Sequence, residues 1–521
     1  MVWSVLERSL VLLLRGASRL LLALLSLAQS FGPRNVRPVP PAVRPLLLLS
    51  GVELARRIRQ KQIKCVDVIQ EYISRIRDVN PIINAVVAER FAAALKEAKE
   101  VDNRIAEGGE DVKSLEESVP YLGVPFTVKE AIALEGSPNS SGLVSRKNVI
   151  ALTDADVVTN LRKAGAIPLG VTNCSELCMW YESSNNLYGT TRNPYNVDRI
   201  VGGSSGGEGC IIAAAGSVMG VGSDIGGSIR MPAFFNGIYG HKPTTGLVPN
   251  GGQFPNATGR KAEFLCTGPM CRYVEDLIPM LKVMAGPNIS KVKLDEEVFI
   301  KKVKFYSMEH DGGSPFVSKV DSELIRAQRK AKFLFYPSTE KDCNPAMMPA
   351  THMAVITEKP GTHLKQPNST SAESTICGLN INHQQGVLML SSLKSSAPSL
   401  VITEDLAKAN HQSNVKLMNM SRNLQNEFSN LLGDDGVFLY PSHPKIAPRH
   451  HHPKLMPFNF AYTAIFNVLG LPVTQCPLGL SKDGLPLGIQ LVANHHNDHL
   501  CLRVAQHLEC AFGGWRNPGA P

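Results

Sequence analysis

The stretch 202–230 constrains this chain more than any other, because it contains two dense clusters of glycine and serine. It reads GGSSGGEGC at 202–210, continues through small and apolar residues, and ends in GVGSDIGGSIR at 220–230. A flexible linker would not carry the apolar residues 211–215, nor Asp224 and Arg230, which have the character of buried residues. We therefore interpret the stretch as part of a packed core.

Two phosphate-binding patterns do not fit this stretch. A P-loop needs Lys followed by Ser or Thr after its last glycine, whereas Ser228 and Ile229 follow Gly227 here. A dinucleotide fingerprint needs a glycine at its sixth position, and counting from Gly220 places Ile225 there. An acyl-transfer site remains as the interpretation.

In an acyl-transfer site, closely spaced backbone N–H groups stabilise the oxyanion that develops in the transition state. Glycine-rich turns can present such groups without obstruction by side chains. The predicted oxyanion hole is formed by Ile225, Gly226, Gly227 and Ser228. It suits a serine nucleophile.

A serine nucleophile needs a base, because its free hydroxyl reacts weakly. His241 follows in GHKP, but Ser228 does not stand in a GxSxG elbow, because 226–230 read GGSIR. Lys129, in VPFTVKE, is the alternative base, since burial disfavours the charged form of an amine.

Three motifs in this order carry a resemblance to a known family: TVKE at 127–130, GGSSGGEG at 202–209 and DIGGSIRMP at 224–232. With them the chain resembles the amidase signature family, whose members use a Ser–Ser–Lys triad. The resemblance implies an α/β fold with a large mixed twisted sheet surrounded by helices and preceded by an N-terminal hydrophobic helix.

The resemblance assigns Ser228 as the nucleophile, Lys129 as the base, and Ser204 as the bridge between them, after a cis peptide at Gly203. Ser205 is the rival for the bridging role, and the spacing to Ser228 favours Ser204. No cofactor and no metal are implied.

Further residues receive roles with the same resemblance. Asp224 and Arg230 are expected to support the glycine turn, and Ser183 and Ser184 to lie near the site. Substrate binding is assigned to Ser204 and to a channel wall of Cys178 and Met179, for which an ordinary core position is the alternative.

The spacing of the cysteine and histidine residues does not match a metal-binding motif. The 11 cysteines are scattered without paired CxxC clusters. The run His450, His451 and His452 is flanked by prolines, and we expect it to be a solvent-exposed loop.

Hydrophobic periodicity predicts the elements around these motifs. Ser50 and Glu53 have the spacing of a capping box before a helix that ends near Lys61, and apolar residues at helical spacing predict a helix over 67–78. A further helix is expected at 155–164, and strands at 123–128, 167–171 and 436–440. Strands that alternate with helices predict an α/β core with a mixed or partly parallel sheet.

The N-terminus is rich in leucine from 10 to 31 but is interrupted by Arg15 and Arg19. We predict a membrane anchor over 1–32, either a single span or a helix lying in the interface, followed by a Pro-rich linker over 33–45. A signal peptide cleaved after Ala28 is the third interpretation. The expected location is a membrane, with an endomembrane or a lipid droplet surface as candidates.

The catalytic core is expected in two parts, 46–332 and 415–521. The segment 333–414 between them shows neither periodicity nor resemblance, and reads as disordered or mis-assembled. A second departure is Asn494, His495 and His496, where a turn with glycine is expected before Asp498.

The resemblance implies hydrolysis of fatty-acid amides, both primary amides and N-acylethanolamines, to fatty acid and amine. Two alternatives are kept: an amidotransferase subunit that feeds ammonia to aminoacyl-tRNA, and a membrane-bound protein with impaired catalysis. The net charge of +9 suits an anionic membrane surface but not a nucleic-acid partner. The expected partners are a lipid amide and a membrane, with a homodimer allowed.

Overall fold

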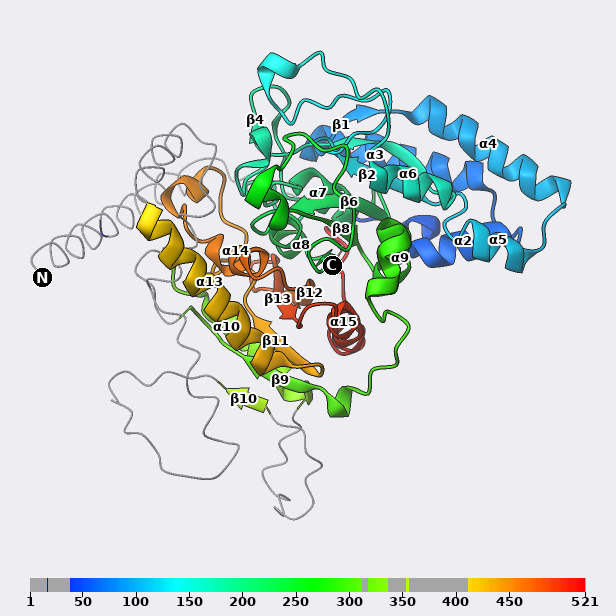
Figure 1. Cartoon of the computed structure of the whole chain (residues 1–521). Helices are drawn as coiled ribbons and strands as arrows, with labels where there is room; N and C mark the ends of the chain where they lie inside the picture. Colours follow the sequence, from blue (N-terminus) through cyan, green and yellow to red (C-terminus); the bar gives the residue numbers. More distant parts are fainter. Residues whose placement is uncertain (1–15, 17–37, 312–316, 336–352, 356–410, 521) are drawn as a thin grey trace, which may run out of the picture.

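The computed structural model describes residues 16, 38–311, 317–335, 353–355 and 411–520 (Figure 1). Their main feature is a sheet of 11 strands in the order β1-β3-β2-β6-β8-β7-β12-β13-β11-β9-β10. In that order the strands are Val86–Glu89, Ile167–Thr172, Pro125–Lys129, Met219–Asp224, Cys266–Cys271, Tyr239–Lys242, Val473–Leu480, Pro486–Val492, Gly436–Tyr440, Lys304–Ser307 and Met353–Val355. Both parallel and antiparallel neighbours occur in this sheet, so the expected α/β fold with a large mixed sheet is confirmed.

Helices surround this sheet (Figure 1). Those of the first half are α2 (Gly51–Arg59), α3 (Cys65–Ile83), α4 (Phe91–Glu107), α5 (Val112–Ser118), α6 (Asp156–Lys163), α7 (Gly206–Ala213), α8 (Arg230–Phe235) and α9 (Leu277–Ala285). The later ones are α10 (Ser322–Phe335), α13 (His411–Leu432), α14 (Ala461–Val468) and α15 (Asp498–Phe512). A separate ribbon pairs β4 (Ser184–Asn185) with β5 (Gly189–Thr190).

Three parallel strands, β3, β2 and β6, bring the TVKE motif and the start of the DIGGSIRMP motif to one edge of the sheet. β2 lies between β3 and β6 and runs parallel to both, with Lys129 opposite Thr172 and Val128 opposite Val221. Because parallel strands end at the same edge of a sheet, Lys129 and the last residues of β6 come together there.

The glycines of 206–209 let α7 pack tightly against this edge. All eight residues of α7 are buried. A Cβ at Gly207 would lie 2.5 Å from the backbone N of Asn173, and one at Gly209 would lie 2.8 Å from the side chain of Asn236. Only glycine permits this close approach at both positions.

The expected local elements are confirmed with shifted bounds. Ser50 caps α2 by accepting a hydrogen bond from the Glu53 N–H at 3.1 Å. α3 extends beyond the expected 67–78, because Val79 and Ile83 continue its buried face. β2 begins later than expected, since Gly123 turns the chain at φ 75°.

The predicted anchor over 1–32 lies outside the described residues, except for residue 16. Over the part of the chain that the structure places, no helix is both long and apolar enough to cross a membrane. Within the predicted linker, residues 38–45 are described, and there Val39 and Ala42 are buried against the core.

Most of the segment 333–414 also lies outside the described residues. What is described of it comprises the end of α10, the strand β10 and the first residues of α13. α13 begins at His411, slightly before the expected return of helical structure.

Candidate active site

Lys129 ends β2 with its side chain fully buried. Its Nζ donates hydrogen bonds to Ser204 Oγ at 2.7 Å and to Ser223 Oγ at 3.0 Å. The structure therefore brings the predicted base and the predicted bridging serine into contact. Ser223, near the end of β6, is a partner that the sequence reading did not identify.

Ser204 lies in a turn that begins with a cis peptide between Gly203 and Ser204. Gly203 has no room for a side chain, because a Cβ would lie 2.4 Å from the carbonyl oxygen of Trp180. Ser183, which was expected near the site, holds this turn, since its Oγ donates to the Gly202 carbonyl at 3.0 Å and accepts from the Gly206 N–H at 3.0 Å.

Ser205, the rival for the bridging role, faces the backbone of β6. Its Oγ accepts from the Ser223 N–H and donates to the Ser223 carbonyl, both at 3.3 Å. Its N–H donates to the Ser228 carbonyl at 3.1 Å, which ties the two serine clusters together. The hydroxyl of Ser204, and not that of Ser205, contacts Lys129.

Ser228 lies two residues before the first residue of α8, and 7% of its surface is exposed. Of the predicted oxyanion donors, the Gly227 N–H donates to Asp224 Oδ1 at 2.7 Å. Among the described residues, no acceptor is shown for the N–H groups of Ile225, Gly226 and Ser228. Three of the four predicted donors therefore stay available to an oxyanion, whereas Gly227 serves the turn itself.

Asp224 and Arg230 form a fully buried pair across this turn. Arg230 donates from Nε to Asp224 Oδ2 at 3.0 Å and from Nη2 to Oδ1 at 2.9 Å. Burial raises the pKa of Asp224, but the charge and hydrogen bonds of Arg230, together with Asn467 and the Ile229 N–H, outweigh it and hold the pKa below its ordinary value. The carboxylate thus stays charged and fixes the backbone around Ser228.

Glu208 is a second buried carboxyl group that the sequence reading passed over, although it belongs to the GGSSGGEG motif. Its oxygens accept hydrogen bonds from Thr127 Oγ1 at 2.8 Å and Thr172 Oγ1 at 2.7 Å. Burial raises its pKa to about 8, against the opposing effects of the two hydroxyls and Lys129. A lone acidic residue inside a glycine-rich motif was the available signal.

Glu130, next to Lys129, organises the loop at 140–141. Its carboxylate accepts from the N–H groups of Ser140 and Ser141, each at 2.7 Å, and from the Tyr188 hydroxyl at 3.0 Å. Burial raises its pKa despite these bonds. Glu130 therefore positions the loop against which Cys178 lies.

Cys178 and Met179, the predicted channel residues, are both partly exposed. Cys178 Sγ lies 3.3 Å from Ser141 Oγ. Ser184 is also partly exposed, and its hydroxyl pairs with Thr190 Oγ1 at 2.7 Å. Binding of an acyl chain by Cys178 and Met179 stays a prediction.

His241 is fully buried and is engaged elsewhere. Its Nδ1 lies 2.8 Å from Thr474 Oγ1, and its Nε2 lies 3.1 Å from Asp498 Oδ1. Asp498 also accepts from the Thr244 hydroxyl at 2.6 Å. At the departure before Asp498 the chain still turns, with His496 at φ 63°.

The expectation of an exposed histidine loop at 450–452 is wrong in part. His451 is exposed, but His452 is buried and His450 Nδ1 lies 2.9 Å from Glu182 Oε1. Buried Glu182 draws the loop inward because an isolated carboxylate is costly to bury. In the described part of the chain, no three His, Cys, Asp or Glu residues gather as a metal site.

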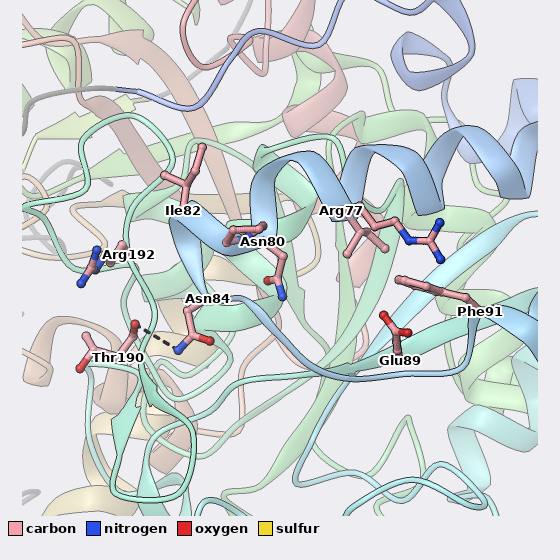
Figure 2. Close-up of a pocket in the computed structure, with 10 residues that line it drawn as sticks. Arg77, Asn80, Ile82, Asn84, Glu89, Phe91, Thr190 and Arg192 are labelled. Atoms are coloured by element: carbon pink, nitrogen blue, oxygen red, sulfur yellow. Dashed lines mark hydrogen bonds between the residues drawn. The ribbon is translucent and has the colours of Figure 1, made fainter.

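A surface hollow of about 690 Å³ lies apart from these residues (Figure 2). It is formed by the end of α3, the residues that follow it and the segment at 190–192, where Asn84 Nδ2 donates to the Thr190 carbonyl at 3.4 Å. None of Lys129, Ser204 and Ser228 lines it.

The chain matches the family described as Amidase over residues 67–312 and 344–502, so the second match includes most of the segment 333–414. It is 53% identical over 516 residues to fatty-acid amide hydrolase 2 of Homo sapiens, which covers 94% of each chain. It is 51% identical to fatty-acid amide hydrolase 2-A of Danio rerio, with 98% of each chain covered. The solved structure of a fatty acid amide hydrolase superposes with a TM-score of 0.72 at 21% identity, covering 91% of this chain and 87% of that one, which supports the fold.

Proposed function

The chain belongs to the amidase family, and we propose that it hydrolyses fatty-acid amides to a fatty acid and an amine through an acyl-enzyme on Ser228. The observation that carries this proposal is the buried contact of 2.7 Å between Lys129 Nζ and Ser204 Oγ. It joins a base and a bridging hydroxyl beside the turn that presents Ser228.

In the proposed reaction, Ser228 Oγ attacks the amide carbonyl while its proton passes to Ser204 and from there to the amine of Lys129. The oxyanion of the tetrahedral intermediate accepts hydrogen bonds from the N–H groups of Ile225, Gly226 and Ser228. The proton then returns through Ser204 to the leaving nitrogen, and the C–N bond breaks. Water repeats the sequence on the acyl-enzyme and releases the acid.

Two neighbouring groups position this relay. Ser223 supplies a second hydroxyl at 3.0 Å from Lys129 Nζ, which restricts the directions available to the amine. The Asp224–Arg230 pair holds the backbone from Gly227 to Ile229, so the available N–H groups keep their directions without a substrate. A preformed oxyanion site needs little rearrangement during the reaction.

The substrate class rests on the two relatives named fatty-acid amide hydrolase 2, which match this chain along nearly its whole length. Primary fatty amides and N-acylethanolamines are the substrates to test. The amidotransferase and impaired-catalysis alternatives have less support, because these relatives share about half of their residues with this chain and Lys129 contacts Ser204.

Membrane attachment through 1–32 belongs to the same proposal, since a lipid amide partitions into the bilayer. Delivery from an endomembrane or a lipid droplet surface, and pairing as a homodimer, are also proposed. Removing residues 1–32 and fractionating the product tests the anchor, which is rejected if the shortened protein is equally membrane-bound.

The test of the chemistry is covalent labelling of the purified chain with a fluorophosphonate probe, together with release of fatty acid from oleamide. We expect label on Ser228, with loss of both signals in Ser228→Ala. In Lys129→Ala and Ser204→Ala, turnover should fall by roughly 10²–10⁴-fold, the usual contribution of general acid–base catalysis.

Ser184→Ala is the matched control, because that hydroxyl bonds Thr190 and not Lys129. It should keep label and turnover. A folded parent protein that takes no label at Ser228, or a Ser228→Ala variant with full turnover, would refute the mechanism.

A further inference from the structure

A second hollow, of about 460 Å³, lies between the loop 445–456 and the start of α10. Its polar wall includes Arg199, Arg449 and His452, and its apolar wall includes Met456 and Leu485. The volume falls within the roughly 300–1,000 Å³ of small-molecule sites. None of the three residues proposed for catalysis lines this hollow, so it is separate from the site of amide cleavage.

Arg199 and Arg449 face each other across a short antiparallel bridge. The Ile200 N–H donates to the Pro448 carbonyl at 2.9 Å, and a matching bond of 3.4 Å flanks the pair on its other side. Opposite residues of an antiparallel pair project to the same face, and their side chains come closest in this non-hydrogen-bonded arrangement. Two like charges placed directly opposite are destabilising unless a negative charge lies between them.

Neither guanidinium is neutralised by an ion pair within the part of the chain that the structure describes. Arg199 Nη1 donates to a backbone carbonyl at 3.2 Å, which is a neutral acceptor. Of the carboxylates that line the hollow, Asp321 pairs with Lys445 at 2.6 Å and Glu323 accepts a backbone N–H at 3.0 Å. Asp483, which is exposed, is the carboxylate that remains to balance two guanidinium charges.

His452 adds a buried group without a partner to the same wall. The residue is 8% exposed, and its Nε2 is buried with no hydrogen-bond partner among the described residues. Burial lowers the pKa of His452, and the charges of Arg449 and Arg199 lower it further, so the imidazole is neutral at pH 7 and can donate one N–H. A buried polar atom without a partner calls for an explanation, and a bound ligand supplies one.

We propose that Arg199, Arg449 and His452 bind a phosphate monoester in this hollow. A phosphate monoester carries close to two negative charges at neutral pH and three free oxygens, which match two guanidinium groups and one imidazole N–H. A carboxylate offers one charge and two oxygens. The guanidinium fork also suits bidentate contact with phosphate oxygens. Because Met456 and Leu485 line the remaining space, the ester is either a small soluble one or the headgroup of a lipid such as phosphatidic acid.

The hollow is connected to the turn that begins with Gly203. The Tyr181 hydroxyl donates to the Met456 carbonyl at 2.6 Å, and Glu182 Oε2 accepts from the His451 N–H at 3.1 Å. A Cβ at Gly203 would lie 3.0 Å from the backbone N of Glu182, so residues 181–183 pack against that turn. A ligand that holds 449–452 in place therefore also restrains 181–183.

The test is calorimetric titration of the full chain with glycerol 3-phosphate. We expect saturable binding that weakens about 10-fold or more in Arg449→Met, because charge-assisted hydrogen bonds are lost. Lys454→Met is the matched control, since Lys454 is exposed on the same loop but does not line the hollow, and its affinity should stay within about twofold of the parent. Asp483→Asn should bind several-fold more tightly, because it removes a repelling carboxylate. Circular dichroism checks that each variant is folded.

The absence of saturable binding, an equal loss of affinity in Arg449→Met and Lys454→Met, or weaker binding in Asp483→Asn would overturn the proposal. Because Asp483→Asn removes none of the proposed contacts, it decides the question even if Arg449→Met folds poorly. Acetate that binds as tightly as glycerol 3-phosphate would reject the phosphate class.

Dioctanoyl phosphatidic acid, used below its micelle concentration, distinguishes the two sources of the phosphate. Binding tighter than that of glycerol 3-phosphate assigns a lipid, since Met456 and Leu485 line the space beside the phosphate. Binding that is equal or weaker assigns a soluble ester.

Hydrogen exchange tests the connection to the catalytic turn. Bound glycerol 3-phosphate should slow exchange of the Ile200 and Ser183 amides, which donate to the Pro448 and Gly202 carbonyls, in the parent but not in Arg449→Met. Unchanged exchange at both amides in a saturated parent chain would refute the restraint. These measurements need no amide hydrolysis and can be repeated in Ser228→Ala, so the proposed function can fail without them.

Discussion

Asp224 and Glu208 are two fully buried carboxyl groups of the same site, and they differ in what surrounds them. Asp224 faces the guanidinium of Arg230 at 2.9 Å, so its pKa lies below the ordinary value despite burial. Glu208 faces two threonine hydroxyls, and burial raises its pKa to about 8. One therefore carries a charge at neutral pH and the other carries a proton.

The difference separates two tasks. A charged Asp224 can hold several N–H groups of the Ser228 turn at once, because charge-assisted hydrogen bonds are the stronger ones. A protonated Glu208 fills the space under Gly220 without placing a negative charge near Lys129. The turn that carries Ser228 is held by charge, whereas the strands beneath Lys129 are joined by neutral hydrogen bonds.

The largest expected effect comes from breaking the charged pair. Arg230→Met leaves Asp224 buried without its cation and should lower the free energy of unfolding by about 3–5 kcal/mol. Urea denaturation followed by circular dichroism measures it. Arg329→Met is the matched control, since its pair with Glu309 is exposed and should contribute no more than about 1 kcal/mol. Equal losses in the two variants would contradict the assignment of Asp224 as the organising charge.

The sequence alone points to the motif residues but not to the contacts that they make with their neighbours. Lys129, Ser204 and Ser228 each stand in a recognisable motif, and α2, β2, β3 and β11 follow from local patterns. The contact of Lys129 with Ser223 depends on the parallel register of β2 and β6, which no local pattern specifies. The protonation of Glu208 depends on burial from several directions, and the engagement of the Gly227 N–H depends on where Asp224 folds back.

The second prediction concerns the opposite dependence of the two carboxyl groups on pH. Because the folded pKa of Glu208 is raised from 4.5 to about 8, the folded state binds more protons than the unfolded state in that window. Its contribution to stability is fully present below pH about 4.5 and is lost as pH rises to about 8, by an amount on the order of a few kcal/mol. For Asp224, whose pKa is lowered, the contribution is present above the unfolded pKa and is lost as pH falls.

Glu208→Gln should remove this loss, because glutamine copies the protonated acid and cannot ionise. Unfolding free energies of parent and variant at pH 5 and pH 8 measure this. The curves should lie close together at pH 5 and separate as the pH rises to about 8, with the variant the more stable. Parallel curves across this range would mean that Glu208 is already charged in the folded protein.

The smallest expected effect comes from removing one neutral donor. Thr172→Val deletes the hydroxyl that donates to Glu208 Oε1 at 2.7 Å and should cost about 1 kcal/mol at pH 6, the usual net contribution of such a bond. At pH 9 the cost should grow, because a carboxylate depends more on its donors than a neutral acid does. A double-mutant cycle of Thr172→Val and Glu208→Gln isolates the contribution of this hydrogen bond. The side-chain amide of the glutamine does not ionise, so its bond to the Thr172 hydroxyl has the same strength at both pH values. If Thr172→Val lowers the free energy of unfolding equally at pH 6 and pH 9, then Glu208 does not ionise between these two pH values. The distinction between a protonated Glu208 and a charged Asp224 would then fail.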